Sequence, residues 1–323
     1  MNPGAWTRRT LASRPFLVLA VGVAAVSSAA IWVRYSNLPP TVLAFYRLGF
    51  SALALWPAAL LRVRSAPGVF RPPGWVSLAA LAGVSLAAHW AVWFRSLELT
   101  SVLSSTVLVT TQPLWVVGLA YVLWREPVGR ERAGALGLAL AGSVGIAMAD
   151  ATLGAAGGQA AGRASPAGHD LYGDMLALLA AALVSVYLLV GQKLRPRVSL
   201  VPYLCVVYTA GALSLAATAV ATGTPLWGWP AGQVLVGLGM AVVPTLIGHS
   251  ALNLVVGRLG AATVATAVLG EPVGASLLAA ALFGEVPGPL HWLGAAAILA
   301  GIYRFSARPA PPRQGVQTRA IGT

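Results

Sequence analysis

The two halves of this chain carry the same polar marks at the same spacing. In the first half Gln112 precedes a proline and is followed fourteen residues later by Glu126. In the second half Glu271 precedes a proline and is followed fourteen residues later by Glu285, so the two sets are offset by 159 residues. Both sets lie on strongly apolar stretches. The chain is therefore expected to contain a duplicated membrane unit.

Ten apolar stretches are long enough, or nearly so, to cross a bilayer as helices. The chain is 58% hydrophobic and 9% charged, a composition that a soluble domain could not cover with polar groups. Five spans per half is an odd number, so the second unit enters the membrane in the opposite direction to the first. We expect an all-α polytopic membrane protein with ten transmembrane helices in two inverted five-helix repeats, an architecture typical of transporters. The spans are placed at about 15–34, 41–61, 74–94, 101–123, 133–149, 174–192, 200–221, 232–252, 261–282 and 290–304.

The basic residues predict the orientation. If the N-terminus is cytoplasmic, 17 of the 21 Lys and Arg residues fall on cytoplasmic segments. Positive charge of this asymmetry sets orientation, so both termini are predicted on the cytoplasmic side of the cell membrane. The net charge of +13 is spread over separate segments that flank the membrane. Anionic lipid headgroups are therefore the expected partner, and nucleic acid is not.

The segments around the spans set the domain boundaries. We expect a cytoplasmic N-terminal segment at 1–14, a first repeat at 15–149 and a second at 174–305. The Gly- and Ala-rich stretch 150–173 is predicted to be a flexible external linker, and 306–323 a disordered cytoplasmic tail. Arg8 and Arg9 before an apolar run also occur in twin-arginine signals, but the first helix is needed to complete the first five-helix unit. Cys205 is the single cysteine, so neither a disulfide nor a thiolate metal site is expected, and no metal or other cofactor is predicted.

Two polar residues lie at the centre of repeat-related spans. Glu271 is ten residues into 261–282 and Gln112 eleven residues into 101–123. At about 1.5 Å per residue, each lies roughly 15 Å deep, near mid-bilayer. Pro113 and Pro272 follow them, and each leaves a helix carbonyl without its usual donor. Such groups at the midplane suit a transporter's site for substrate or coupling ion. The alternative is that Gln112 and Glu271 are hydrogen-bonding partners that hold the halves together.

Arg47 is the only basic residue clearly inside a predicted span. It is a candidate counter-charge that would keep the Glu271 carboxylate ionised. Without such a partner, a carboxylate inside the membrane is a candidate proton carrier. The alternative for Arg47 is that its side chain reaches the external headgroups or caps a helix end.

A second repeat-related pair is His89 and His249, predicted near opposite ends of their spans. The pair could belong to two gates, or consist of two interfacial histidines bonded to neighbouring helices. One helical turn after His249, Asn253 shares its face of the helix. Trp90 and Tyr187 are aromatic residues within spans that could line a cavity or pack in the core.

These features resemble the EamA-type transporters of the drug/metabolite transporter superfamily. The resemblance covers about 15–305 and is carried by TVLAFYRLGF, by TTQPLWVVGLAYVLWREPVGRERAGALGLALAGSVGIA and by VLGEPVGASLLAAALFGEVPGPLHWLGAAAILAGIYRF. It maps the family's Glu-Pro onto Glu271-Pro272 and its arginine in the second helix onto Arg47. It implies a carrier that moves amino acids, other small metabolites or drugs, often outward. The expected function is a secondary transporter and exporter of a small organic metabolite by alternating access, with the proton as a candidate coupling ion.

Other classes of function have weaker support. Drug or amine efflux by the same fold is the nearest alternative. An intramembrane hydrolase would need a nucleophile, but Gly248-His249-Ser250-Ala251-Leu252 only approaches the G-x-S-x-G motif and lacks its strand-to-helix turn. A channel would need a filter sequence, and none repeats here. We therefore do not expect an enzyme.

Overall fold

The computed structural model describes residues 14–65, 73–100, 102–156, 169–284 and 287–307. Within these ranges the regular structure is helical. The first half contains α2 (Pro15–Ser27), α3 (Ala29–Arg34), α4 (Pro40–Ser65), α5 (Trp75–Leu99), α6 (Val102–Val109), α7 (Gln112–Trp124) and α8 (Arg130–Ala156). The second half contains α9 (His169–Leu194), α10 (Leu200–Ala221), α11 (Ala231–Met240), the π-helix η2 (Ala241–His249), α12 (Ser250–Leu259), α13 (Ala261–Val268), α14 (Glu271–Phe283) and α15 (Pro289–Ala307).

Ten membrane-crossing units follow from this order. Nine stretches of the described chain are long and apolar enough to span a membrane, and α15, with 19 residues, packs along α8 as the tenth unit. The predicted fold is thus confirmed. Several helices run beyond their predicted ends, because helical hydrogen bonding continues past the apolar window into polar residues. The linker predicted at 150–173 is helical at both flanks, in α8 and α9, while its centre, 157–168, and the tail from 308 lie outside the described residues.

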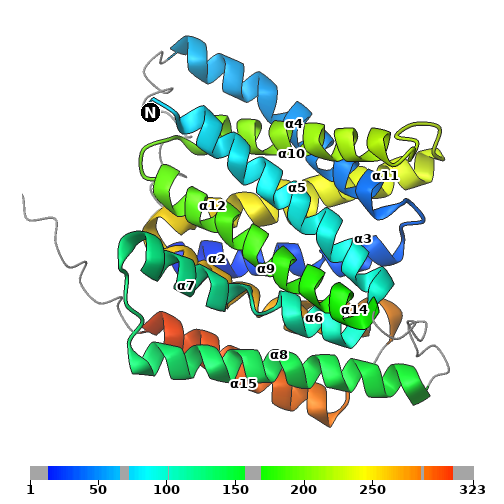
Figure 1. Cartoon of the computed structure of the whole chain (residues 1–323), viewed down its shortest axis with the longest axis vertical. Coiled ribbons are helices and arrows are strands. Elements are labelled where there is room, and N and C mark those ends of the chain that lie inside the picture. The colour runs from blue at the N-terminus through cyan, green and yellow to red at the C-terminus, as the bar shows by residue number, and fades with distance from the viewer. Residues whose placement is uncertain (1–13, 66–72, 101, 157–168, 285–286, 308–323) are drawn as a thin grey trace, which may run out of the picture.

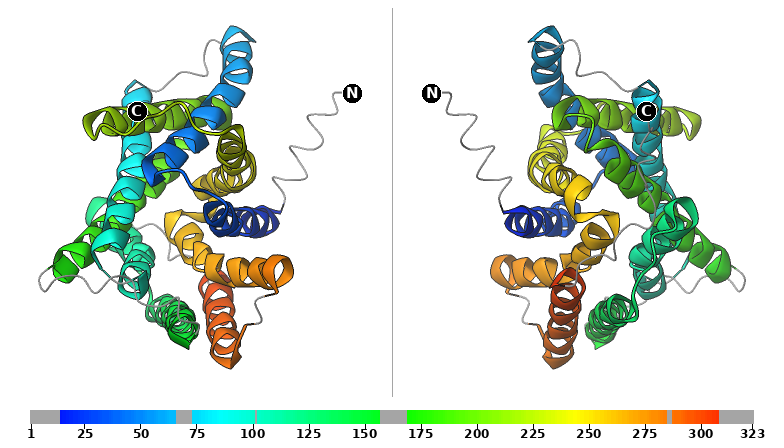
Figure 2. Two further views of the ribbon diagram at one scale, coloured as in Figure 1. Left: turned by 90° about the vertical axis from the view of Figure 1, so that its right-hand side faces the viewer. Right: turned by 90° about the vertical axis from the view of Figure 1, so that its left-hand side faces the viewer.

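The two repeats pack as counterparts of one another. The fifth units, α8 and α15, lie side by side along one edge of the bundle (Figure 1), and the second units, α4 and α10, pack together near the opposite edge (Figure 2). Glycines allow the first of these pairs to approach closely. A Cβ on Gly142 would lie 2.5 Å from the carbonyl oxygen of Gly294, and one on Gly301 would lie 2.6 Å from that of Ala135. Small residues at a membrane helix crossing permit such backbone contact.

The symmetry fails between the two ends of the bundle. At one end α13 packs against α7 and α9, and α12 packs against α9. At the other end, the repeat-related counterpart of α13 with α7 is α6 with α14. The counterpart of α13 with α9 is α6 with α2 or α3, and that of α12 with α9 is α5 with α3. Over the described residues none of these pairs makes comparable packing contacts. We call the first the packed end and the second the loose end.

Candidate functional site

The fourth unit of each repeat is broken at its predicted polar-Pro pair. The unit α6–α7 breaks after Val109 and restarts at Gln112, and α13–α14 breaks after Val268 and restarts at Glu271. Proline suits the first turn of a helix because the nitrogen there needs no donor. Gln112 and Glu271 are therefore the first residues of half-helices that begin inside the bundle. The N-terminal end of a helix carries partial positive charge, which favours an anionic group such as the Glu271 carboxylate.

Arg47 points into the protein and not toward a membrane surface. The side chain is 7% exposed. Its Nε donates a hydrogen bond of 2.6 Å to Oγ1 of Thr245, and its guanidinium lies 4.3 Å from the ring centre of Trp90. Thr245 in turn donates to the carbonyl of Met240 at 2.9 Å. Arg47 is thus fixed in orientation by η2 and α5, and the alternative in which its side chain reaches the external headgroups is not what the structure shows.

A chain of polar groups continues from η2 to α9. Asn253 Nδ2 donates to the Tyr187 hydroxyl at 2.5 Å and to the carbonyl of His249 at 2.8 Å. The Tyr187 hydroxyl lies 3.4 Å from His249 Nδ1, so it can donate its own hydrogen there. Trp90 meets the His249 ring edge to face at 6.3 Å. The structure therefore gathers His249, Asn253, Tyr187 and Trp90 beside Arg47.

The histidines lie deeper than the sequence predicted. Because α5 and α12 run further than expected, His89 and His249 are each ten residues before the end of their helix, or about 15 Å inside it. The predicted position near the helix ends is therefore corrected. His89 Nδ1 donates to the carbonyl of Ala180 at 2.8 Å, because a carbonyl only accepts, and its ring stacks on Trp93.

Opposite charges share this region without touching. Arg47 and Glu271 lie within electrostatic reach of each other, yet no ion-pair contact joins them. The Glu271 side chain is partly accessible. Over the described residues, Glu271 makes no side-chain hydrogen bond, and the only one that Arg47 makes is through Nε. The two carboxylate oxygens and the terminal guanidinium nitrogens are therefore available to a ligand.

Gln112 is connected to the neighbouring α9. Its carbonyl, one of the groups near the break, accepts a hydrogen bond of 3.1 Å from the hydroxyl of Ser185. The side chain is partly accessible, like that of Glu271. The break in α6–α7 is also stabilised by Thr110 and Thr111, whose hydroxyls donate to the carbonyls of Val107 and Leu108.

Sequence reasoning missed three contributors. The first is η2, where the wider π-helical turn places Thr245 against Arg47. Pro244 inside this stretch was the available signal, since proline disturbs regular helix bonding. The second is Gln192, whose Oε1 accepts a hydrogen bond from the Ala261 nitrogen. The third is Arg195, which donates to the carbonyl of Asn253 at 2.9 Å. Burial lowers the pKa of Arg195 to about 10, so it remains charged at neutral pH.

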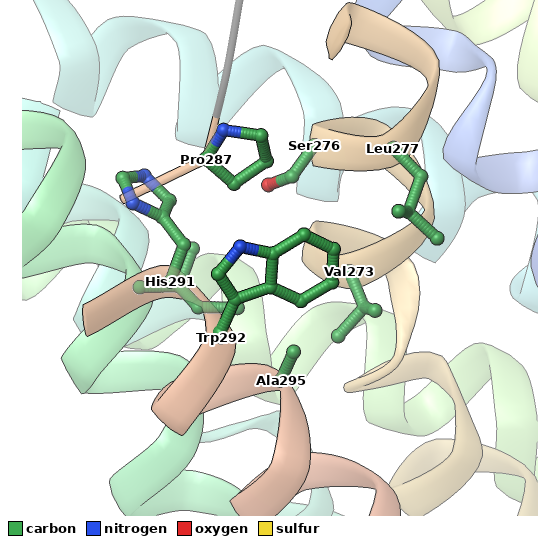
Figure 3. A pocket seen from close by; sticks show the side chains of 8 residues that line it. Val273, Ser276, Leu277, Pro287, His291, Trp292 and Ala295 are labelled. Carbon is green, nitrogen blue, oxygen red and sulfur yellow. The ribbon is translucent and has the colours of Figure 1, made fainter. Parts of the chain in front are cut away.

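A separate pocket lies between α14 and α15 (Figure 3). Val273, Ser276 and Leu277 of α14 face Trp292 of α15 across it. Leu277 and Trp292 are about half exposed, at 49% and 54%. The described residues that line the pocket include no carboxylate, lysine or arginine. The candidate site is therefore the charged region around Arg47 and Glu271 and not this pocket.

The fold is that of a multi-pass helical membrane protein, and comparison with known proteins specifies the family. The profile of the EamA-like transporter family matches the chain twice, over residues 14–148 and 171–307. The chain belongs to the EamA-like transporter family and so carries a small molecule across a membrane. Among the solved structures with a similar fold is a crystal structure with a TM-score of 0.74 and 19% identity, which covers 91% of this chain and 98% of that chain. No curated protein matched.

Proposed function

We propose that the chain carries a small zwitterionic metabolite, an amino acid or a similar compound, out of the cell by alternating access. One observation carries this proposal: a cation and a carboxylate share one region of the protein interior, and each has polar atoms available to a ligand. A substrate with both an anionic and a cationic group would satisfy both. Neither charge would then be left alone in a medium of low dielectric constant.

The contacts support a specific pose. The substrate carboxylate would meet the terminal nitrogens of Arg47, whose fork of donors suits a carboxylate. The ammonium group would meet Glu271, and Trp90, Tyr187 and His249 would surround the rest. This arrangement needs no direct pair between Arg47 and Glu271, in keeping with the structure. The predicted pairing of these residues is thus replaced by a bridge through the substrate.

Glu271 is also the proposed carrier of a coupling proton. Among the spans that the structure describes, it is the only acidic residue in a central part. When no substrate ammonium is bound, a proton can neutralise the carboxylate in its place. Exchange of the two cations on one carboxylate would couple substrate movement to proton movement in the opposite direction.

The proposed location is the cytoplasmic membrane, with both termini inside and anionic lipid headgroups around the basic segments. The support is the distribution of Lys and Arg. In this orientation the packed end is cytoplasmic and the loose end faces outward. Thr224→Cys, beyond the end of α10, should react with an impermeant maleimide added outside intact cells. Reaction only after the cells are opened would contradict the orientation.

Counterflow in proteoliposomes tests the substrate class. Vesicles preloaded with an unlabelled amino acid should trap the labelled compound, whereas the matching amine and the matching acid, each lacking one charge, should trap little. Strong counterflow of hydrophobic amines with no response to amino acids would favour the alternative, drug or amine efflux through Glu271 and Trp90. Flux that shows neither saturation nor counterflow would contradict a carrier of any substrate.

A further inference from the structure

The packed end is joined by hydrogen bonds from α9. Gln192 Oε1 accepts a bond of 2.5 Å from the Ala261 nitrogen on α13. Tyr187 accepts a bond of 2.5 Å from Asn253 on α12. These bonds join α9, the first unit of the second repeat, to α12 at the end of the third unit and to α13 at the start of the fourth. They are made inside the protein, where water does not compete well for them.

Gln192 acts as a helix cap supplied by another helix. Ala261 is the first residue of α13, and its nitrogen is one of the donors that have no partner within the helix. Gly260 precedes it with a φ of 82°, a conformation that suits glycine. The Gln192 side chain is 9% exposed, so this bond is buried. It therefore attaches α9 to the half-helix that leads directly to Glu271.

The first repeat has no side-chain acceptor at the position of Gln192. The repeat offset is 159 residues for Gln112 and Glu271, 160 for the two histidines and 162 for Tyr46 and Tyr208. This range places Gln192 opposite 30–33. Those four residues, Ala30, Ile31, Trp32 and Val33, have no side-chain acceptor. With the offset of 160 shared by the histidines, Asn253 corresponds to Trp93. The indole nitrogen of Trp93 is buried without a hydrogen-bond partner.

We propose that Gln192, with Asn253, is a latch that holds the carrier closed at the packed end, and that Gln192 acts by capping α13. Because the first repeat has no side-chain acceptor at the position of Gln192, the two states of the transport cycle are unequal in energy. The carrier rests with its packed end closed, and each cycle must break the Gln192 bond. Gln192 is thus a positioning residue for the conformational step and touches no substrate, so the inference stands whichever compound is carried.

Cysteine reactivity of the purified protein tests the latch. Ala265 on α13 is 1% exposed, so Ala265→Cys should react slowly with a maleimide while the packed end is closed. Gln192→Leu removes the acceptor, so the Ala261 nitrogen has no partner while the packed end is closed. When that end opens, water can reach the nitrogen, so the substitution destabilises the closed state relative to the open state. We expect the labelling rate to rise about fivefold to tenfold, as loss of one buried hydrogen bond implies. Transport should show a changed KM and kcat together, because the populations of both states shift.

Three controls make the test decisive. Gln192→Glu keeps an acceptor oxygen and should restore slow labelling. Gln233→Leu removes an exposed bond of the same chemical kind, from the Asn37 nitrogen at 2.7 Å and away from the packed end, and should leave the rate at the parent value. Cys205, buried in α10, reports unfolding and should stay unlabelled throughout. An unchanged rate in Gln192→Leu, an equal rise in Gln192→Glu or Gln233→Leu, or parallel labelling of Cys205 would each overturn the latch.

Discussion

Replacing Glu271 by Gln should give a protein that folds and inserts but transports at least tenfold more slowly. Gln keeps the shape and an acceptor oxygen but removes the charge that would meet a substrate ammonium. A hydrogen bond to a charged group is worth about 1.5–3 kcal/mol, or roughly ten- to a hundredfold in binding. Residual flux should no longer respond to an imposed pH gradient, because the proposed proton site is gone. Flux and pH profile are measured in proteoliposomes at equal protein content.

Two variants control for this result. Glu131→Gln removes a carboxylate on an exposed residue at the start of α8 and should transport like the parent. Gln112→Glu places a second carboxylate at the repeat-related break and should reduce transport more than it reduces expression. Parent-like flux and pH response in Glu271→Gln would assign Glu271 to helix packing alone.

Replacing Arg47 by Ala should weaken binding of a carboxylate substrate by roughly ten- to a hundredfold, the range for a charge-assisted hydrogen bond. Arg47→Lys should recover only part of the loss, because an ammonium cannot reproduce both the bond to Thr245 and the planar contact with Trp90. Arg34→Ala is the matched control. Its guanidinium also lies over a ring, that of Phe283 at 4.0 Å, but near the end of α3. Binding is measured by substrate protection against thermal unfolding.

Much of the fold could be predicted, because the bilayer imposes simple rules. Three features can be determined directly from the sequence. They are the span length, the odd number of spans per repeat and the two proline positions. The breaks before Gln112 and Glu271 follow directly from Pro113 and Pro272. The helix ends were less predictable, since hydropathy marks where lipid is crossed and not where helical hydrogen bonding stops. For this reason His89 and His249 were predicted near helix ends, whereas the structure places them well inside their helices.

The assembly of the site could be predicted only in part. The sequence identified Arg47 and Glu271 as the unusual charges, but not that each would leave polar atoms available. That depends on Thr245, which η2 positions, and π-helical turns have no strong sequence signal. Gln192 could not be recognised as important from the sequence, because a single glutamine near a helix end is common in proteins. Its importance comes from Ala261, 69 residues away in the chain.

The most direct test of the proposed substrate site, formed by Arg47 and Glu271, removes the carboxylate from the ligand and the guanidinium from the protein, separately and together. Binding of an amino acid and of its decarboxylated amine should be measured to the parent and to Arg47→Ala by isothermal titration. If Arg47 holds the carboxylate, the parent should prefer the amino acid by roughly ten- to a hundredfold, and Arg47→Ala should lose that preference while binding the amine about as the parent does. A preference that survives in Arg47→Ala, or an equal loss of affinity for both compounds, would contradict the account.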